Sequence, residues 1–349
     1  MLLDWVTARV PLDLLGDQDR ERLRQLGDRI RRYNAETGEV VYECQAWDSI
    51  RSDSHHLSFR VGTDALWMQG SPARVIGDGD AVFGAGPARA LDLVGCVERM
   101  REVLSGALEL ALPSSPDCWI VSRVDVTGNL LLPTLADVRS ALALLRNCEG
   151  GRYRVSQQAG DTVYWSQKSK HKSAKAYAKG PHLQFLMKKK DYDGRRYSRV
   201  EIDLGSRLLR LEESLRTHYF ARTLGKPWYE IEPAELKAEW QAYFGRMLGA
   251  AEVTEVNIEE RVMAVADTEG RAKAAIGCWA LIKAYGWEKA RDMSGKRTWY
   301  YNLKVLRAAG LSDADLSAGN VVHIRRPLIE CRMVDSWEQL EGLCSKKAA

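Results

Sequence analysis

A tyrosine with lysines on both sides lies in the most basic stretch of the chain. Residues 165–199 contain 11 Lys and Arg residues against two acids. If residues 173–179 form a β-strand, the two-residue repeat places Lys175, Tyr177 and Lys179 on one face and three alanines on the other. A phenol between two ammonium groups can hold a phosphate beside a hydroxyl, which makes Tyr177 a candidate nucleophile. The alternative is a tyrosine ring that packs on an ordinary solvated basic face.

Three other segments with strand-like alternation carry an acid and an arginine on their polar side. These pairs are Arg123 with Asp125, Arg199 with Glu201, and Arg210 with Glu212. If the segments belong to one sheet, carboxylate oxygens gather on one face, as Mg²⁺ or Mn²⁺ requires. Lys175, Arg123 and Arg210 are then candidate contacts to DNA phosphates. The alternative is a set of cross-strand ion pairs with no metal.

The rest of the composition excludes several classes of protein. The net charge of the 349 residues is only +4, so the local basic stretches say more than the total. None of the six histidines has the spacing of a zinc hydrolase. The seven cysteines form no CxxC pair, which indicates a reducing cytosol. No apolar run reaches the roughly 18 residues of a membrane span, and the first residues do not form a signal peptide, so we expect an intracellular protein.

The pattern of the first two thirds predicts an α+β fold. Helical periodicity is expected at residues 23–33, 93–104 and 135–145, and a glycine-rich loop at residues 70–86 is expected to cap the second helix. Strands are expected at residues 2–10, 39–47, 57–68, 118–127, 162–166, 173–179, 199–204 and 208–216. Such short connections favour an antiparallel sheet covered by helices.

The last third changes character after Gly225. Helices are expected at residues 233–248, 271–285, 287–293 and 298–309. Residues 271–310 hold nine Lys and Arg residues against two acids, and a turn containing Lys296 and Arg297 suits a helix-turn-helix DNA reader. The alternative is a solvated basic surface. We therefore predict two domains, residues 1–225 around the sheet and residues 226–349 as a helical DNA-binding or partner domain.

The order of these motifs resembles the gene II protein family, the replication initiators of filamentous bacteriophages. The resemblance covers most of the chain. Its motifs are Leu3-Asp4-Trp5-Val6, Ser71-Pro72-Ala73-Arg74-Val75, Gly79-Asp80-Ala81-Val82-Phe83-Gly84, Ser122-Arg123-Val124-Asp125, Ala176-Tyr177-Ala178-Lys179 and Leu209-Arg210-Leu211-Glu212. The covalent tyrosine of the family occupies the position of Tyr177. The related HUH (Rep-like) endonucleases bind their metal through a histidine pair that this sequence lacks.

Membership would imply a metal-dependent tyrosine endonuclease that nicks one strand of supercoiled phage DNA and later rejoins it, with residues 1–225 as the nicking and closing domain. Lys175, Lys179 and a Mg²⁺ or Mn²⁺ ion held by Asp125 and Glu212, with Glu201 as a further ligand, would support attack by Tyr177. The implied partners are phage origin DNA, as duplex and single strand, a host replicative helicase and further copies of the chain on the origin. The implied location is the host bacterial cytoplasm, without a membrane.

Two other classes of function stay open at this point. One is a non-catalytic phage DNA-binding regulator that uses only the helical domain. The other is an RNA-binding protein that stacks bases on Tyr164, Trp165 and Tyr177. Acids on the face that carries Tyr177 favour the enzyme, because a protein that only binds phosphate gains nothing from carboxylates beside it.

Overall fold

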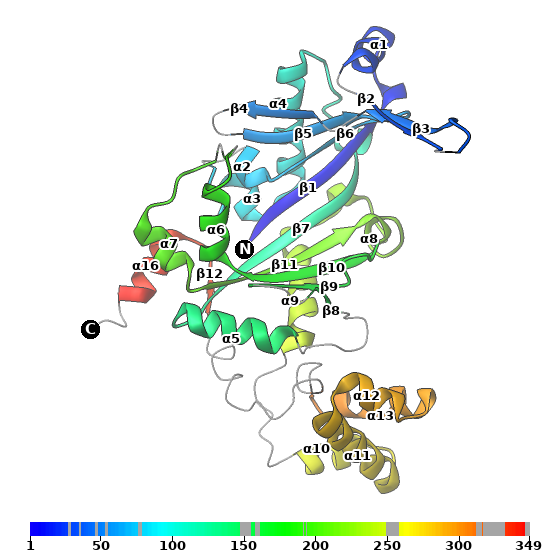
Figure 1. The fold of residues 1–349 in the computed structure, drawn as a ribbon, viewed down its shortest axis with the longest axis vertical. Helices are drawn as coiled ribbons and strands as arrows, with labels where there is room; N and C mark the ends of the chain where they lie inside the picture. The colour runs from blue at the N-terminus through cyan, green and yellow to red at the C-terminus, as the bar shows by residue number, and fades with distance from the viewer. Residues whose placement is uncertain are drawn as a thin grey trace.

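A computed structural model gives the fold of the chain. It describes residues 1–26, 29–34, 36–45, 48–52, 55–75, 79–146, 155–157, 161–190, 192, 194–248, 258–311, 316 and 332–345. A ten-stranded antiparallel sheet forms the centre, with a separate two-stranded hairpin beside it (Figure 1). None of the described helices is long and apolar enough to span a membrane.

The strands follow one another in the sheet order β4-β5-β6-β1-β7-β11-β10-β9-β8, and β12 also pairs with β7. Their bounds are β1 Leu2–Pro11, β4 Asp48–Ser52, β5 His55–Val61, β6 Ala65–Gly70, β7 Ile120–Leu131, β8 Val155–Gln157, β9 Thr162–Trp165, β10 Lys172–Ala178, β11 Leu208–Arg216 and β12 Arg332–Val334. The separate hairpin consists of β2 Arg29–Tyr33 and β3 Val40–Gln45. The long strand β7 lies between β1 and β11, so it joins the two halves of the sheet.

The helices surround the sheet and form most of the last third. Their bounds are α1 Asp17–Gln25, α2 Pro72–Val75, α3 Gly86–Ala90, α4 Leu93–Leu108, α5 Leu135–Arg146, α6 Lys179–Met187, α7 Arg199–Gly205, α8 Thr217–Arg222, α9 Pro233–Leu248, α10 Ile258–Val265, α11 Glu269–Tyr285, α12 Trp287–Asp292, α13 Lys296–Ala308 and α16 Trp337–Ser345. The expected antiparallel sheet with covering helices and a helical region toward the C-terminus is confirmed.

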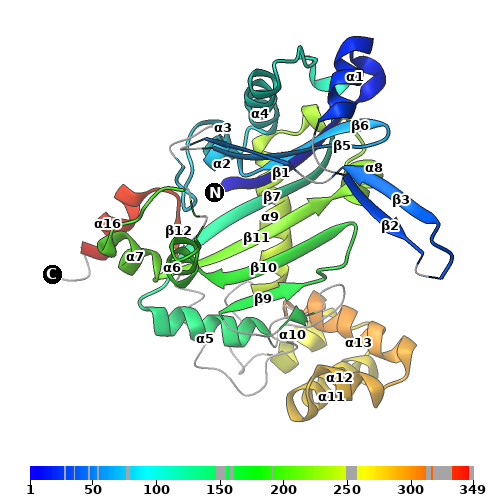
Figure 2. The same cartoon turned by 45° about the horizontal axis from the view of Figure 1, so that its top comes forward.

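One face of the sheet, the apolar face, holds the main core. Strand residues such as Val6, Val124 and Leu211 point to this side and are fully buried. Helix α9 crosses behind the sheet (Figure 2), where the Trp240 indole donates to the Leu211 carbonyl at 3.0 Å. Helix α4 begins where the Asp92 side chain caps the Gly95 amide, and its four-residue apolar spacing continues the same core. The opposite face, the polar face, carries the alternate residues of the same strands.

The last third forms a helical unit, residues 258–311, with its own buried cluster. Trp299, Leu303 and Leu306 of α13 pack with Ala275 and Ile282 of α11, and this cluster shares no buried residue with the sheet core in the described part of the chain. The division of the buried residues differs from the predicted boundary at residue 225. Helix α9 belongs to the sheet core, because its apolar side covers β7 and β11.

The C-terminal segment, residues 332–345, returns to the sheet after the helical unit. Strand β12 pairs with residues 129–131 of β7, directly beyond the part of β7 that pairs with β1. The close fit is visible at Gly128, where a Cβ atom would lie only 2.8 Å from the Met333 side chain. The sheet unit therefore contains residues from both ends of the chain.

Four sequence predictions of secondary structure need correction. Residues 199–204 form helix α7, because Ser198 and Glu201 make a reciprocal capping box. Residues 57–68 form two strands, which turn at Gly62, whose amide donates to the Ala65 carbonyl. The helix expected at residues 23–33 ends at Gln25, and β2 follows after residues 27–28, which lie outside the described part. Likewise, the end of the strand expected at residues 39–47 lies outside the described residues.

Candidate functional site

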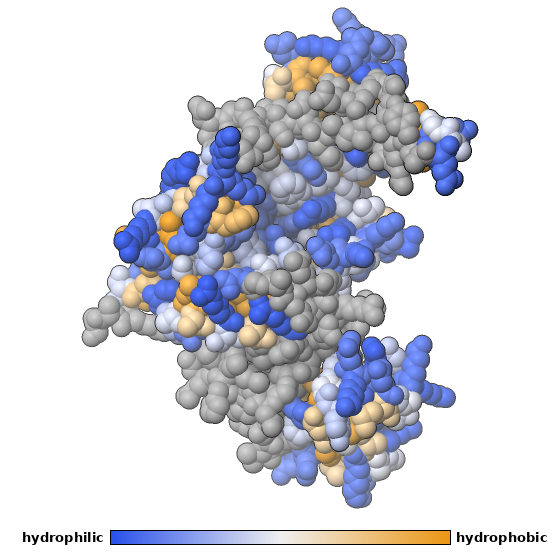
Figure 3. All heavy atoms as spheres, in the orientation of Figure 1, coloured by the Kyte–Doolittle hydropathy of each residue, from blue (hydrophilic) through white to orange (hydrophobic). Residues whose placement is uncertain are grey.

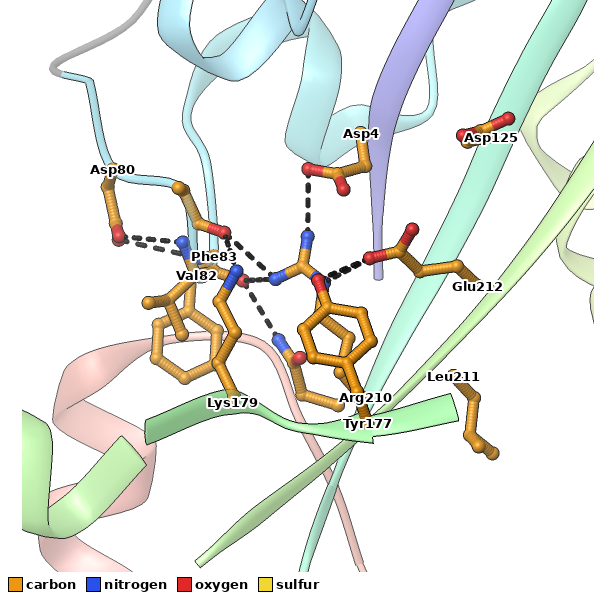
Figure 4. A network of polar contacts seen from close by, with 12 residues as sticks. Asp4, Asp80, Val82, Phe83, Asp125, Tyr177, Lys179, Arg210, Leu211 and Glu212 are labelled. Atoms are coloured by element: carbon orange, nitrogen blue, oxygen red, sulfur yellow. Dashed lines mark hydrogen bonds and ion pairs between the residues drawn. The ribbon is translucent and has the colours of Figure 1, made fainter. Parts of the chain in front are cut away.

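Tyr177 lies on the polar face of β10, near the strand's C-terminal end. Its hydroxyl donates a hydrogen bond to Oε1 of Glu212 on the neighbouring strand at 2.5 Å. The side chain is only 5% exposed, so the prediction of an exposed strand face is wrong. The phenol instead lies in a buried network of charged side chains, drawn in Figure 4.

Arg210 is the centre of this network and is completely buried. Its guanidinium group contacts Glu212 at 3.1 Å and Asp4 at 2.9 Å. It also donates to the carbonyls of Ala81 and Val82 at 2.9 and 3.0 Å. A register shift between Leu3 and Trp5 in the pairing of β1 with β7 accompanies the position of Asp4 beside Arg210.

Both predicted lysines take part, although they reach the site differently. Lys175 is opposite Glu212 in the strand pairing, and its Nζ lies 2.6 Å from Glu212 Oε2. Lys179 does not continue the strand but begins helix α6, where its Nζ donates to the Ala81 carbonyl at 2.7 Å. The next residue must be glycine, because a Cβ at Gly180 would lie 2.5 Å from the Ser206 backbone nitrogen. This close approach of α6 to the end of α7 fixes where Lys179 enters the site.

The charges and the burial change the acidity of each group. Burial, together with the negative charge of Glu212, raises the pKa of the Tyr177 phenol well above its ordinary value. Burial alone would raise the pKa of the Glu212 carboxyl, but Lys175 and Arg210 outweigh it and hold that pKa far below the usual range. Burial and the charge of Arg210 lower the pKa of Lys179 to about 7. In this arrangement Tyr177 keeps its proton and Glu212 is ionised.

Asp125 shares the polar face, one step along the sheet from Glu212. It is opposite Ser214 in the pairing of β7 with β11, whereas Glu212 is opposite Thr127. Asp125 is 2% exposed and receives two hydrogen bonds from Arg123, at 2.9 and 2.6 Å. The predicted Arg–acid pairing on this strand is therefore present, and Asp125 lies diagonally next to Glu212.

Glu201 does not reach the site. It lies on α7, where it closes the capping box with Ser198 and contacts Arg195 at 2.6 Å. The predicted ligand set of Asp125, Glu212 and Glu201 is thus not assembled. Among the described residues, no three His, Cys, Asp or Glu side chains are arranged to hold a metal ion. Asp4, which contacts Arg210, is a further acid beside Glu212.

Sequence reasoning missed two acids of the network. Asp4 binds Arg210, and Asp80 is 3% exposed beside the loop that covers the polar face. Each acid occurs in a motif of the sequence, but nothing local in the sequence marks it as buried. Asp4 interrupts a run of apolar strand residues, which is the one signal that could have been used.

Lys296 and Arg297 lie far along the chain, in the helical unit. Both belong to the first turn of α13 rather than to the expected turn before it, and both are exposed. Gly295 precedes the helix, and α12 ends at Asp292, so a short connection separates the two helices. Figure 3 shows the described part of this unit with many hydrophilic side chains on the visible surface.

Comparison with known proteins agrees with this architecture. The family described as the N-terminal part of the replication-associated protein encoded by phage gene II matches residues 2–242, which include the sheet unit up to α9. This chain belongs to that family. The replication-associated protein of the same name in Enterobacteria phage I2-2 is 30% identical over 191 residues, which cover 51% of this chain and 52% of that protein. The chain thus matches about half the length of this relative.

Proposed function

We propose that the protein is a phage replication initiator that nicks one strand of origin DNA and rejoins it during rolling-circle replication. The single observation that carries this proposal is the contact of the Tyr177 hydroxyl with Glu212, inside a network that includes Arg210, Lys175 and Lys179. A core tyrosine without a task would not need four charged neighbours. The name of the phage I2-2 relative supports a role in replication.

In the proposed reaction, the Tyr177 oxygen attacks a phosphorus atom of the DNA backbone. The new O–P bond joins the protein to the 5′ phosphate, the bond from phosphorus to the 3′ oxygen breaks, and the 3′ oxygen leaves with a proton. The phenolic proton goes to a base of the site. Because the phosphotyrosine ester keeps the energy of the broken ester, the reverse attack by a 3′ hydroxyl closes the strand without a nucleotide.

The resting pKa values divide the roles. Lys179, with a pKa of about 7, is the group that can accept a proton near neutral pH, whereas the strongly acidic Glu212 carboxyl orients the phenol. Lys175 is 33% exposed and lies at the edge of the network, where it can reach a phosphate. Because Tyr177 is almost fully covered, access of the phosphate requires side chains such as Lys175 to move when DNA binds.

Asp125 and Glu212 are the residues that would hold Mg²⁺ or Mn²⁺, because their oxygens and a DNA phosphate suit a hard cation. Such an ion would neutralise charge on the phosphate. Arg123 and Lys175 contact these two carboxylates in the structure, so we propose that both cations turn to DNA phosphates as the ion binds. Asp4 replaces Glu201 as the third nearby acid in this proposal.

The polar face beyond the site supports binding of a single strand. The Arg123 guanidinium lies 5.6 Å from the Trp5 ring, and Arg9 and Arg60 lie 5.0 and 5.6 Å from the Trp67 ring. Alternating aromatic rings and arginines suit bases and phosphates of an unpaired strand. These residues lie on β1, β5, β6 and β7, which are neighbours in the sheet, so a strand that crosses this face would lead toward Tyr177.

The helical unit is proposed to recognise duplex origin DNA through α13, with Lys296 and Arg297 on phosphates. A host helicase and further copies of the chain are proposed partners at the origin, and the host cytoplasm is the proposed location. The test is incubation of the protein with supercoiled origin DNA and Mg²⁺, followed by protease digestion and gel electrophoresis. Relaxed circles with a peptide on the 5′ end support the proposal. Bound but uncut DNA would instead indicate a non-catalytic regulator.

A further inference from the structure

A loop far from β10 in sequence closes the network around Tyr177. This site loop, residues 79–84, directs two carbonyl groups to the polar face. The Ala81 carbonyl accepts from Lys179 at 2.7 Å and from Arg210 at 2.9 Å. The Val82 carbonyl accepts from Arg210 at 3.0 Å and from the Asn129 amide at 2.9 Å. The positions of Lys179 and Arg210 therefore depend on the conformation of this loop.

Asp80 holds the loop in that conformation. One carboxylate oxygen accepts from the Val82 amide at 2.9 Å and from the Tyr197 hydroxyl at 3.0 Å. The same tyrosine hydroxyl accepts from the Ala81 amide at 2.8 Å. The carboxylate thus fixes the backbone on either side of the Ala81 carbonyl, the one shared by Lys179 and Arg210.

The C-terminal segment holds Asp80 in turn. The Trp337 indole donates to the second carboxylate oxygen of Asp80 at 2.9 Å. The Trp337 ring meets Phe83 edge to face, with 5.1 Å between centroids, and Leu340 joins Val82 and Phe83 in a small buried cluster. Figure 1 shows α16 beside α7, with β12 leading to it from the sheet. The Trp337–Asp80 contact joins residues that are 257 positions apart in the chain.

We propose that Trp337 and Asp80 are positioning residues for strand cleavage. Through the site loop, the bond between them sets Lys179 and Arg210 against Glu212 and Tyr177. The site is then complete only with a segment that follows the helical unit, although the family match ends at residue 242. This inference rests on the proposed function of Tyr177. It also gives the helical unit a direct connection along the chain to the cleavage site.

The connection is specific because it ends on backbone carbonyls. A segment that only covered the core would contribute apolar contacts, as Leu340 does. Trp337 adds one directed hydrogen bond to a buried carboxylate, which costs free energy if left with fewer partners. Loss of that bond changes the orientation of Asp80 before it changes the packing of Phe83, since phenylalanine at position 337 can keep the ring contact.

The test compares full-length Trp337→Phe with Trp228→Phe. Both variants lose an indole hydrogen bond, but the Trp228 indole donates to the Trp119 carbonyl, at 2.7 Å, away from the site loop. We expect Trp337→Phe to lower the single-turnover rate of covalent attachment at saturating DNA by about 10- to 100-fold, with the dissociation constant for DNA unchanged. Hydrogen exchange at Val82 and Phe83 should become faster. Trp228→Phe should change neither quantity.

A second variant guards against a folding defect at position 337. Asp80→Asn keeps the shape of the side chain and should give the same loss of rate, and the double variant should be no slower than the slower single variant. Wild-type rate and exchange in Trp337→Phe would overturn the inference, as would equal loss in Trp228→Phe. Tyr177→Phe run in parallel separates the two proposals. If wild-type protein forms no adduct through Tyr177, the proposed function fails, whereas exchange at the loop still reports on Trp337.

Discussion

The Tyr177 hydroxyl and the Glu212 carboxylate lie 2.5 Å apart on neighbouring strands, in a diagonal contact, because Tyr177 is directly opposite Arg210. Glu212 is held ionised by Lys175 and Arg210, and the phenol keeps its proton because its pKa is raised. The pair therefore orients the nucleophile but does not activate it. We infer that DNA binding must supply the change that makes Tyr177 reactive.

Replacement of Tyr177 by phenylalanine should abolish covalent attachment to origin DNA and leave DNA binding within about twofold of wild type, because only the hydroxyl is lost and phosphate contacts supply most of the affinity. The ring and the charged neighbours remain. The measurement is a gel of labelled origin DNA before and after protease treatment. The matched control is Tyr164→Phe, because Tyr164 lies opposite Lys175 on the adjacent strand. An adduct that persists in Tyr177→Phe but disappears in Tyr164→Phe would move the nucleophile to Tyr164.

The pH dependence of cleavage should report the proton acceptor. Burial and the charge of Arg210 lower the pKa of Lys179 to about 7, while Asp4, Glu212 and Asp80 act in the opposite direction. Below that pH the amine is protonated and cannot accept the phenolic proton. The single-turnover rate should rise with pH and become constant above about 7.

The variant for this test is Lys179→Met, which keeps the approximate length of the side chain and removes the amine. We expect a loss of rate of about 100-fold and no inflection near neutral pH. Lys175→Met is the control, since Glu212 and Asp4 raise the pKa of Lys175 against the effect of burial. It should weaken phosphate binding and keep the inflection. An unchanged pH profile in Lys179→Met would show that another group takes the proton.

Much of the sheet unit could be predicted because periodicity reports local structure. The long strand β7, the strand β11 and helix α4 each repeat apolar residues at the period of their element. Residues 199–204 also alternate, yet they form α7, and Val200 is 64% exposed. A local sign of the helix was present, because Ser198 and Glu201 have the spacing of a capping box.

The burial of the site could not be predicted in the same way. Alternation placed Tyr177, Arg210 and Glu212 on a polar face, which was correct, but it cannot show what covers that face. The cover comes from Asp4, the site loop and, through it, Trp337, which are distant along the sequence. A polar strand face reads as exposed unless such long-range contacts are known.

Asp125 and Glu212 should differ in their effect on stability. Glu212→Gln removes the partner of two cations in a buried network, which should lower the free energy of unfolding by about 3 kcal/mol. Asp125→Asn loses a pair with Arg123, whose side chain is 37% exposed, and should cost about 1 kcal/mol. Urea unfolding of both variants measures the difference.

The smaller cost makes Asp125→Asn the cleaner test of the metal. If Asp125 holds Mg²⁺, the concentration of Mg²⁺ for half-maximal cleavage should rise by at least about tenfold. Glu102→Gln, which removes an exposed partner of Arg99, is the control for a lost surface ion pair. A large loss of stability in Asp125→Asn with an unchanged Mg²⁺ requirement would make Asp125 a structural ion-pair residue.

The helical unit should bind duplex DNA by itself, because it has its own buried cluster around Trp299. Affinity of a fragment spanning residues 258–311 should fall log-linearly with salt. Replacement of Lys296 and Arg297 by alanine should reduce the slope by about 2, one for each lost phosphate contact. Lys273→Ala, which removes an exposed partner of Glu269, should leave the slope unchanged. A fragment without salt-sensitive binding would be a protein-binding module.

A buried acid on the apolar face gives a prediction about stability that is independent of DNA. Glu213 is completely buried beside Lys172, and burial raises the pKa of its carboxyl to about 7. The folded protein therefore binds this proton more tightly than the unfolded chain does. Its contribution to stability is present below the ordinary glutamate pKa and is lost as pH rises toward about 7.

Glu213→Gln keeps the shape and removes the ionisation, and Lys172 retains Glu239 as a partner. The variant should be more stable than the parent at about pH 8, by about 2 kcal/mol, and the difference should disappear near about pH 4.5. Urea unfolding at a series of pH values measures this difference, with Glu98→Gln on the exposed side of α4 as the control. A variant that is less stable than the parent at the higher pH would show that the ion pair with Lys172 outweighs the cost of burying the charge.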